Sequence, residues 1–329
     1  MATTASEAEN PMVGSATGDY PALMPFDGDI DKLFELWSAD LGDLYSAWNR
    51  TNVQFGAAAK PGSPASRDDA ALELNSPEPY KPEGLGAGID AVQMIDAAAQ
   101  HLNGLRALVN SRAMALAPWP TARAICEHVA VAVWLLEPGI TPKARMARRW
   151  MARLAGAQRL RFLARNGSKA EKRAAKELRD TAREQLLLRF PDADVEWNDP
   201  AESPPWQIAG ESYPTFGQQT RLLSKFGASN VKGLYDTLSL SSHPNVVTLT
   251  MAVEPVDAGG YLMMKYRTDP DDWNATIRLA SDLLYLAANA ACDYFHGQTD
   301  DLTDWYDRYR DRQPDAEATT DNATATSTD

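Results

Sequence analysis

The apolar residues between positions 270 and 297 follow one helical period without a break. Trp273 is followed, at alternating steps of four and three, by Ile277, Ala280 and further apolar side chains up to Tyr294. Because these steps place side chains on one stripe of an α-helix, the segment predicts a long helix with a single buried face. Such a stripe must pack against other elements, and a helical bundle is therefore the expected architecture.

Other segments repeat this period. The expected helices are an N-terminal one within 26–54, then 88–112, 121–136, 141–165, 168–190, 215–240 with a break near Gly227, and 300–312. The second half of 121–136 is apolar on all sides, which predicts a position at the centre of the bundle. Thr141-Pro142 is typical of a helix start, and Ser168 with Glu171 forms a capping box.

The remaining segments complete the expected organisation. Residues 55–85 have a linker composition, and 191–213 form a loop with two tryptophans. A period of two over 247–253, a turn at 255–260 and the run 261–266 predict a β-hairpin within 245–267. Residues 1–25 and the acidic tail 313–329 are polar and are expected to be disordered. The fold class is therefore mainly α: a helical-bundle domain over 86–312 with a small β-hairpin insertion and disordered termini.

Composition excludes several classes of protein. No window reaches the roughly 18 consecutive apolar residues of a transmembrane helix, and the N-terminal residues lack the features of a signal peptide. Cys126 and Cys292 are the only cysteines and lie far apart, which fits a reducing cytoplasm and excludes cysteine-based zinc motifs. We expect a cytoplasmic protein without a membrane partner, and its oligomeric state is left open.

The net charge of −13 combines two opposite parts. Residues 141–190, the basic hairpin, hold 15 Lys and Arg against 4 Asp and Glu, a net of +11, so the rest of the chain carries −24. The hairpin could bind nucleic-acid phosphates or an acidic partner, including the chain's own acidic segments, or be a solvated face. A helical projection groups Arg145, Arg148, Arg149 and Arg159 away from the apolar face of their helix, and this favours the solvated face.

Two polar groupings are candidate sites. Arg123 and Glu127 lie four residues apart on a helix and can pair, either in a central polar cavity or as a structural ion pair, which we favour. The segment 235–244 contributes Tyr235 and Ser239 and ends in His243, which could act as an acid or base at a helix C-terminus. The alternative, which we favour, is a helix end whose polar side chains satisfy free carbonyls.

These two stretches carry a family resemblance. Arg123…Glu127…Trp134-Leu135-Leu136-Glu137-Pro138 and Tyr235-x-x-Leu238-Ser239…His243, over roughly residues 85–297, are similar to uncharacterised actinobacterial-type helical proteins. That group in turn resembles the HEPN-like helical bundles, which include RNA-cleaving toxins and defence ribonucleases. The resemblance implies a helical bundle and raises ribonuclease activity as an alternative to binding.

HEPN ribonucleases carry an arginine, a spacer of four to six residues and a histidine. Arg123 and His128 match this pattern. His243 has no arginine at the matching positions, so a site there would need an arginine from another part of the fold. On a regular helix the side chains of Arg123 and His128 diverge by about 140°. The expectation is therefore a protein that acts by binding, with a ribonuclease and a purely structural protein as the alternatives.

Metal and cofactor sites have little support in the sequence. The four histidines could meet in a bundle, but a di-metal carboxylate site would need two Glu-x-x-His pairs, and there are none. Phosphate-loop and dinucleotide-binding glycine patterns are also absent. We therefore expect neither a metal nor a cofactor.

Overall fold

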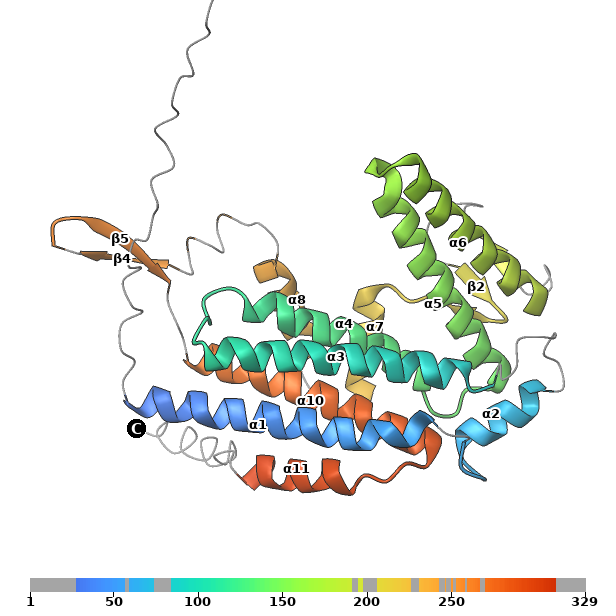
Figure 1. Ribbon diagram of the computed structural model, residues 1–329, viewed down its shortest axis with the longest axis horizontal. Coiled ribbons are helices and arrows are strands. Elements are labelled where there is room, and N and C mark those ends of the chain that lie inside the picture. The colour runs from blue at the N-terminus through green and yellow to red at the C-terminus, as the bar shows by residue number, and fades with distance from the viewer. Residues whose placement is uncertain are drawn as a thin grey trace, which may run out of the picture.

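Over its described residues the protein is a helical bundle with two small β-sheets (Figure 1), which confirms the predicted mainly α fold class. The computed structural model describes residues 28–56, 59–73, 84–190, 195–197, 206–225, 231–242, 246, 250, 253–257, 259–266 and 270–311. The predicted disordered ends, 1–25 and 313–329, lie outside these ranges.

Four long helices form the body of the bundle. They are α1 (Gly28–Asn52), α3 (Gly86–Asn110), α4 (Pro118–Leu136) and α10 (Pro270–Phe295), which lie side by side in Figure 1. A 3₁₀ turn, η1 (Val53–Gly56), ends α1, and α11 (Asp300–Asp311) packs along α1. The N-terminal helix is tied into the bundle, because Trp37 Nε1 donates to Asn274 Oδ1 of α10 at 3.1 Å.

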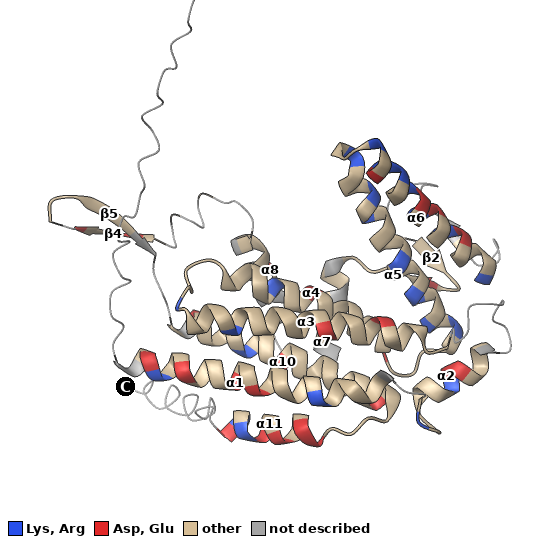
Figure 2. Ribbon diagram, viewed as in Figure 1, with Lys and Arg blue, Asp and Glu red and all other residues tan. Residues whose placement is uncertain are grey.

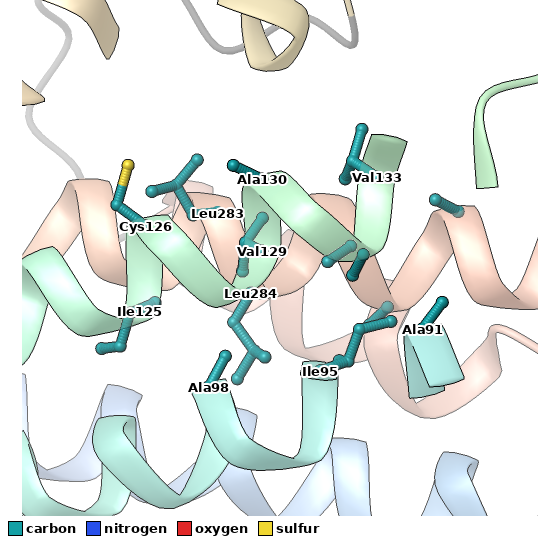
Figure 3. Packing of buried hydrophobic residues seen from close by; sticks show 14 of the residues in the cluster. Ala91, Ile95, Ala98, Ile125, Cys126, Val129, Ala130, Val133, Leu283 and Leu284 are labelled. Carbon is teal, nitrogen blue, oxygen red and sulfur yellow. The ribbon is translucent and has the colours of Figure 1, made fainter. Parts of the chain in front are cut away.

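The core lies where α3, α4 and α10 meet. Ile95, Val129 and Leu284, one from each helix, are fully buried, and Ala98 and Ala130 beside them let the helices approach closely (Figure 3). Burying one such aliphatic side chain stabilises the fold by about 1.5–3 kcal/mol. The second half of α4 is buried almost throughout, which confirms its predicted central position.

The basic hairpin consists of α5 (Pro142–Leu163), a 3₁₀ turn η2 (Ala164–Asn166) and α6 (Lys169–Arg189). Thr141 caps α5 by accepting a hydrogen bond from the Ala144 N–H at 3.1 Å. The predicted capping box opens α6: Ser168 Oγ accepts from the Glu171 N–H at 3.2 Å, and Glu171 Oε2 accepts from the Ser168 N–H at 2.7 Å. The far end of the hairpin projects away from the bundle (Figure 1).

Two segments predicted without regular structure contain some. The linker 55–85 includes α2 (Pro64–Glu73), where Ser63 Oγ accepts from the Ser66 N–H at 3.0 Å and Pro64 is the first helical residue. The predicted loop 191–213 includes strands β1 (Val195–Trp197), β2 (Trp206–Ile208) and β3 (Glu211–Ser212), paired antiparallel in that order. Both predictions were wrong because local signals lay inside stretches rich in proline and glycine. The first segment contains a helix start, and the second contains a hairpin turn.

The turn between β2 and β3 is the local signal in the second segment. Ala209 and Gly210 have φ values of 51° and 79°, the backbone that a two-residue hairpin turn requires. Trp206 and Ile208 alternate with exposed Gln207 and are buried, so β2 packs on the core through these two side chains.

The predicted helix 215–240 is two helices, α7 (Phe216–Lys225) and α8 (Val231–Ser242), which both pack on α4. The expected break near Gly227 falls outside the described residues. The predicted β-hairpin exists as β4 (Val253–Asp257) and β5 (Leu262–Tyr266). Of the predicted first strand 247–253, Val253 begins β4, Thr250 is helical, and the other residues lie outside the described ranges. Val246 and Thr250 are helical, and the Thr250 hydroxyl donates to the Val246 carbonyl at 2.7 Å, a bond that lets a β-branched residue sit in a helix.

Candidate functional site

The first polar grouping is assembled between α4 and α8. Arg123 Nε lies 2.8 Å from Glu127 Oε1, and the Tyr235 hydroxyl donates to the same oxygen at 3.3 Å. The Arg123 guanidinium also lies 5.9 Å from the centre of the Tyr235 ring. Three of the predicted site residues therefore converge, and the predicted pairing of Arg123 with Glu127 is confirmed.

The charges of this cluster are engaged with one another. Burial alone would lower the pKa of Arg123, but the hydrogen bond and charge of Glu127, together with Tyr235, outweigh it and raise that pKa. Burial, followed by the charge of Glu127, raises the pKa of Tyr235. Tyr235 is therefore a neutral hydrogen-bond donor at neutral pH, and the cluster offers no proton acceptor other than a carboxylate that already holds two donors.

His128 lies apart from this cluster. Its Nδ1 is 2.7 Å from the Ala124 carbonyl, and its ring centre is 5.3 Å from that of His101 on α3. Arg123 faces α8 and His128 faces α3. The two residues that match the HEPN-like pattern therefore contact different helices, as their angular separation predicts.

Ser239 and His243 complete the predicted grouping. Ser239 lies one turn beyond Tyr235 on α8 and is half-buried. His243 lies outside the described residues.

The cysteine thiols are buried and unreactive. Burial, followed by the charge of Glu127, raises the pKa of Cys126 to about 12. Burial, followed by the charge of Asp293, likewise raises the pKa of Cys292 to about 12. Both thiols are therefore protonated at neutral pH, which excludes them as thiolate nucleophiles.

The first arginine of the basic hairpin lies inside the protein. Arg145 Nε donates to Asp68 Oδ2 of α2 at 2.7 Å, and its other nitrogens donate to the carbonyls of Leu135 and Glu137. Tyr294 of α10 donates to the same Asp68 oxygen at 2.8 Å. Burial, followed by the charge of Asp68, raises the pKa of Tyr294, so the phenol remains a donor. This buried network joins α2, α4, α5 and α10.

The next two arginines also bind internal carboxylates. Arg148 Nε lies 2.6 Å from Glu211 Oε2 of β3, and its Nη1 lies 2.6 Å from Glu137 Oε2 beyond the end of α4. Arg149 Nε lies 3.1 Å from Asp90 Oδ2 of α3. The hairpin is therefore anchored to α2, α3, α4 and the first sheet through its first turns.

This arrangement corrects the predicted solvated face. Arg145 and Arg148 are buried and Arg149 is nearly so, whereas Arg159 is exposed. The helical projection separated these arginines from the apolar face correctly, but it contains no information about which elements pack on the other side. The alternative that the hairpin binds the chain's own acidic residues is confirmed for the first three arginines.

The far part of the hairpin differs in both burial and charge. We call residues 158–181 the outer hairpin; none of them is buried. This segment holds 8 Lys and Arg against 3 Asp and Glu, a net of +5. Figure 2 shows these charges along the projecting ends of α5 and α6.

The outer hairpin also exposes apolar side chains next to its turn. Leu160, Phe162 and Leu163 are 50%, 59% and 66% exposed. The guanidinium of Arg165 lies 4.6 Å from the centre of the Phe162 ring. Of the four arginines predicted to form a cationic site, only Arg159 lies in the outer hairpin. Apolar residues beside basic ones in 159–163 are visible in the sequence and could have drawn attention to this segment.

Comparisons with protein-family models, with curated proteins and with solved structures find no match to this chain. Among the described residues, no group of three or more His, Cys, Asp and Glu side chains could hold a metal ion. No helix in the described part of the chain is long and apolar enough to cross a membrane.

Proposed function

We propose that this protein acts by binding a nucleic acid through the outer hairpin. The observation that carries the proposal is the division of the basic hairpin into two parts. Its first turns use their arginines to bind internal carboxylates, while the outer hairpin, in which no residue is buried, carries a net charge of +5. Exposed lysines and arginines gathered on a projecting element are the electrostatic footprint of phosphate binding.

The acidic body supports a binding site confined to this element. With +5 on the outer hairpin and −13 overall, the rest of the chain carries −18. The described residues outside the outer hairpin hold 21 Lys and Arg against 27 Asp and Glu, a net of −6, so within the described part of the chain a polyanion is attracted more to the outer hairpin than to the rest.

The anchored first turns support the proposal mechanically. Arg145 and Arg148 each bind two or more partners on other elements, which fixes the angle at which α5 leaves the bundle. A preorganised projection loses less conformational entropy on binding than a flexible one. We assign these two arginines a positioning role and place nucleic-acid contact on the outer hairpin.

The ribonuclease alternative has no comparable support. Arg123 is paired with Glu127 and Tyr235 on one side of α4, and His128 packs against His101 on the other. Three points remain predictions from the sequence. They are the HEPN-like family, the cytoplasmic location, and the binding of an acidic protein in place of nucleic acid.

A binding assay tests the proposal. Fluorescence anisotropy with labelled 20-nucleotide oligonucleotides is measured for the wild type and for a triple variant, Arg159→Glu, Lys169→Glu and Lys172→Glu. The two lysine changes place acids in the first turn of α6, where the helix dipole favours them, so the fold is retained.

The matched control makes the same change of net charge elsewhere. It combines Lys32→Glu on α1, Lys60→Glu before α2 and Arg308→Glu on α11, all exposed. We expect the hairpin variant to lose at least about tenfold in affinity and the control to lose far less. Equal losses in both variants would contradict the proposed site, and no binding by the wild type would contradict the proposed function.

A further inference from the structure

The shape of the outer hairpin bears on which form of nucleic acid it contacts. An α-helix with its side chains is about 10–12 Å across, and packed helices lie about 8–10 Å apart. The two helices of the outer hairpin together are therefore about 20 Å wide, whereas the major groove of B-DNA is about 12 Å wide. Both helices together are too broad to enter that groove, and only one of them could lie in it.

The end of the outer hairpin carries the second observation. Phe162 is the aromatic residue of this segment, and more than half of it is exposed. The Arg165 guanidinium at 4.6 Å from the ring centre adds a cation to the same surface, and Arg159 and Arg161 precede Phe162 in the sequence. A basic surface with an exposed aromatic ring can bind phosphates and stack a base, but only a base that is not already stacked within a duplex.

We infer that the outer hairpin binds single-stranded nucleic acid in preference to duplex, with an unpaired base stacked on Phe162. This inference rests on the proposed function and identifies its ligand class. Stacking uses the face of the base and does not read the 2′-hydroxyl, so RNA and DNA strands of the same length are both ligands.

An anionic lipid surface is the competing occupant, because Leu160 and Leu163 are exposed beside the same cations. The two occupants make different demands on position 162. A lipid surface requires apolar area, which leucine supplies nearly as well as phenylalanine, whereas base stacking requires the aromatic ring. Phe162→Leu therefore separates them, and Leu163→Ala is the matched control, because it removes exposed apolar area without touching the ring.

The test measures binding of a 20-nucleotide oligouridylate, an oligothymidylate, a 20-base-pair DNA duplex and vesicles containing phosphatidylserine. We expect both single strands to bind at least about fivefold more tightly than the duplex. Phe162→Leu should remove most of that preference, and Leu163→Ala should retain it. Both positions are exposed, so unchanged melting temperatures check that the variants fold.

The other outcomes separate failure of the inference from failure of the proposed function. Equal binding of single strand and duplex, both abolished by the hairpin charge reversal, would overturn the inference and leave the proposed function standing. A single-strand preference that survives Phe162→Leu would overturn the stacking contact. Binding to vesicles with no binding to any oligonucleotide would overturn both.

Discussion

Replacing Arg145 with methionine tests whether the basic hairpin is anchored through its buried arginines. The substitution keeps much of the side-chain length and removes the charge, so the Asp68 carboxylate is left buried without its cation. The carbonyls of Leu135 and Glu137 lose their donors as well. Removing one partner of a buried ion pair costs about 3–5 kcal/mol, a large share of a typical total stability of about 5–15 kcal/mol.

Thermal unfolding followed by circular dichroism measures this loss. For a domain of this size each kcal/mol shifts the melting temperature by about 2–4 °C, so Arg145→Met should melt about 6–20 °C below the wild type. Arg159→Met is the matched control, since it makes the same change at an exposed position of the same helix and should stay within about 0.5 kcal/mol.

A double variant identifies the cause. Adding Asp68→Asn to Arg145→Met removes the unpaired charge while keeping an acceptor for the Tyr294 hydroxyl. It should restore part of the lost stability, because the cost arises mainly from the buried carboxylate. An Arg145→Met protein that melts within about 2 °C of Arg159→Met would refute the reasoning.

Three further predictions concern the bundle. Gly88→Ala should destabilise the protein, because the new Cβ would lie 2.5–2.6 Å from two aromatic rings of α10. Gly104→Ala should stabilise it by about 1 kcal/mol, because the new Cβ would meet open space. Urea unfolding measures the stability of both variants. Burial, followed by the charge of His128, lowers the pKa of His101 from 6.5, so the unfolded chain binds more protons. The wild type should therefore lose stability as the pH falls below 6.5 more steeply than His101→Gln in melting experiments at several pH values; parallel curves would contradict this. Finally, the wild type, Arg123→Ala and His128→Ala should show equally negligible cleavage of a labelled RNA, and cleavage lost in both variants would restore the ribonuclease interpretation.

Local sequence signals predicted the elements that local physics decides. The steps of four and three after Trp273 predicted α10, and Thr141-Pro142 and the Ser168 capping box fixed the starts of α5 and α6. The same kind of signal at Ser63-Pro64 marks α2, but the surrounding prolines and glycines concealed it. Local chemistry therefore determines where most of these helices begin.

The partners of the basic hairpin could not be predicted in this way. Arg145, Arg148 and Arg149 bind carboxylates that lie 77, 63 and 59 residues away in the sequence, on elements whose placement depends on the whole fold. A helical period shows which side chains share a face and does not show what covers that face. In contrast, Arg123 and Glu127 are neighbours on one helix, and for that reason their pairing was predictable.

The salt dependence of nucleic-acid binding tests the central claim most directly. Each phosphate neutralised by the outer hairpin releases counterions, so the logarithm of the affinity for a single strand falls with the logarithm of salt concentration with a slope of about −0.7 per contact. The account predicts a shallower slope, with weaker binding, when Arg159, Lys169 and Lys172 are reversed, and an unchanged slope in the matched control. Identical slopes for the wild type and the hairpin variant would contradict it.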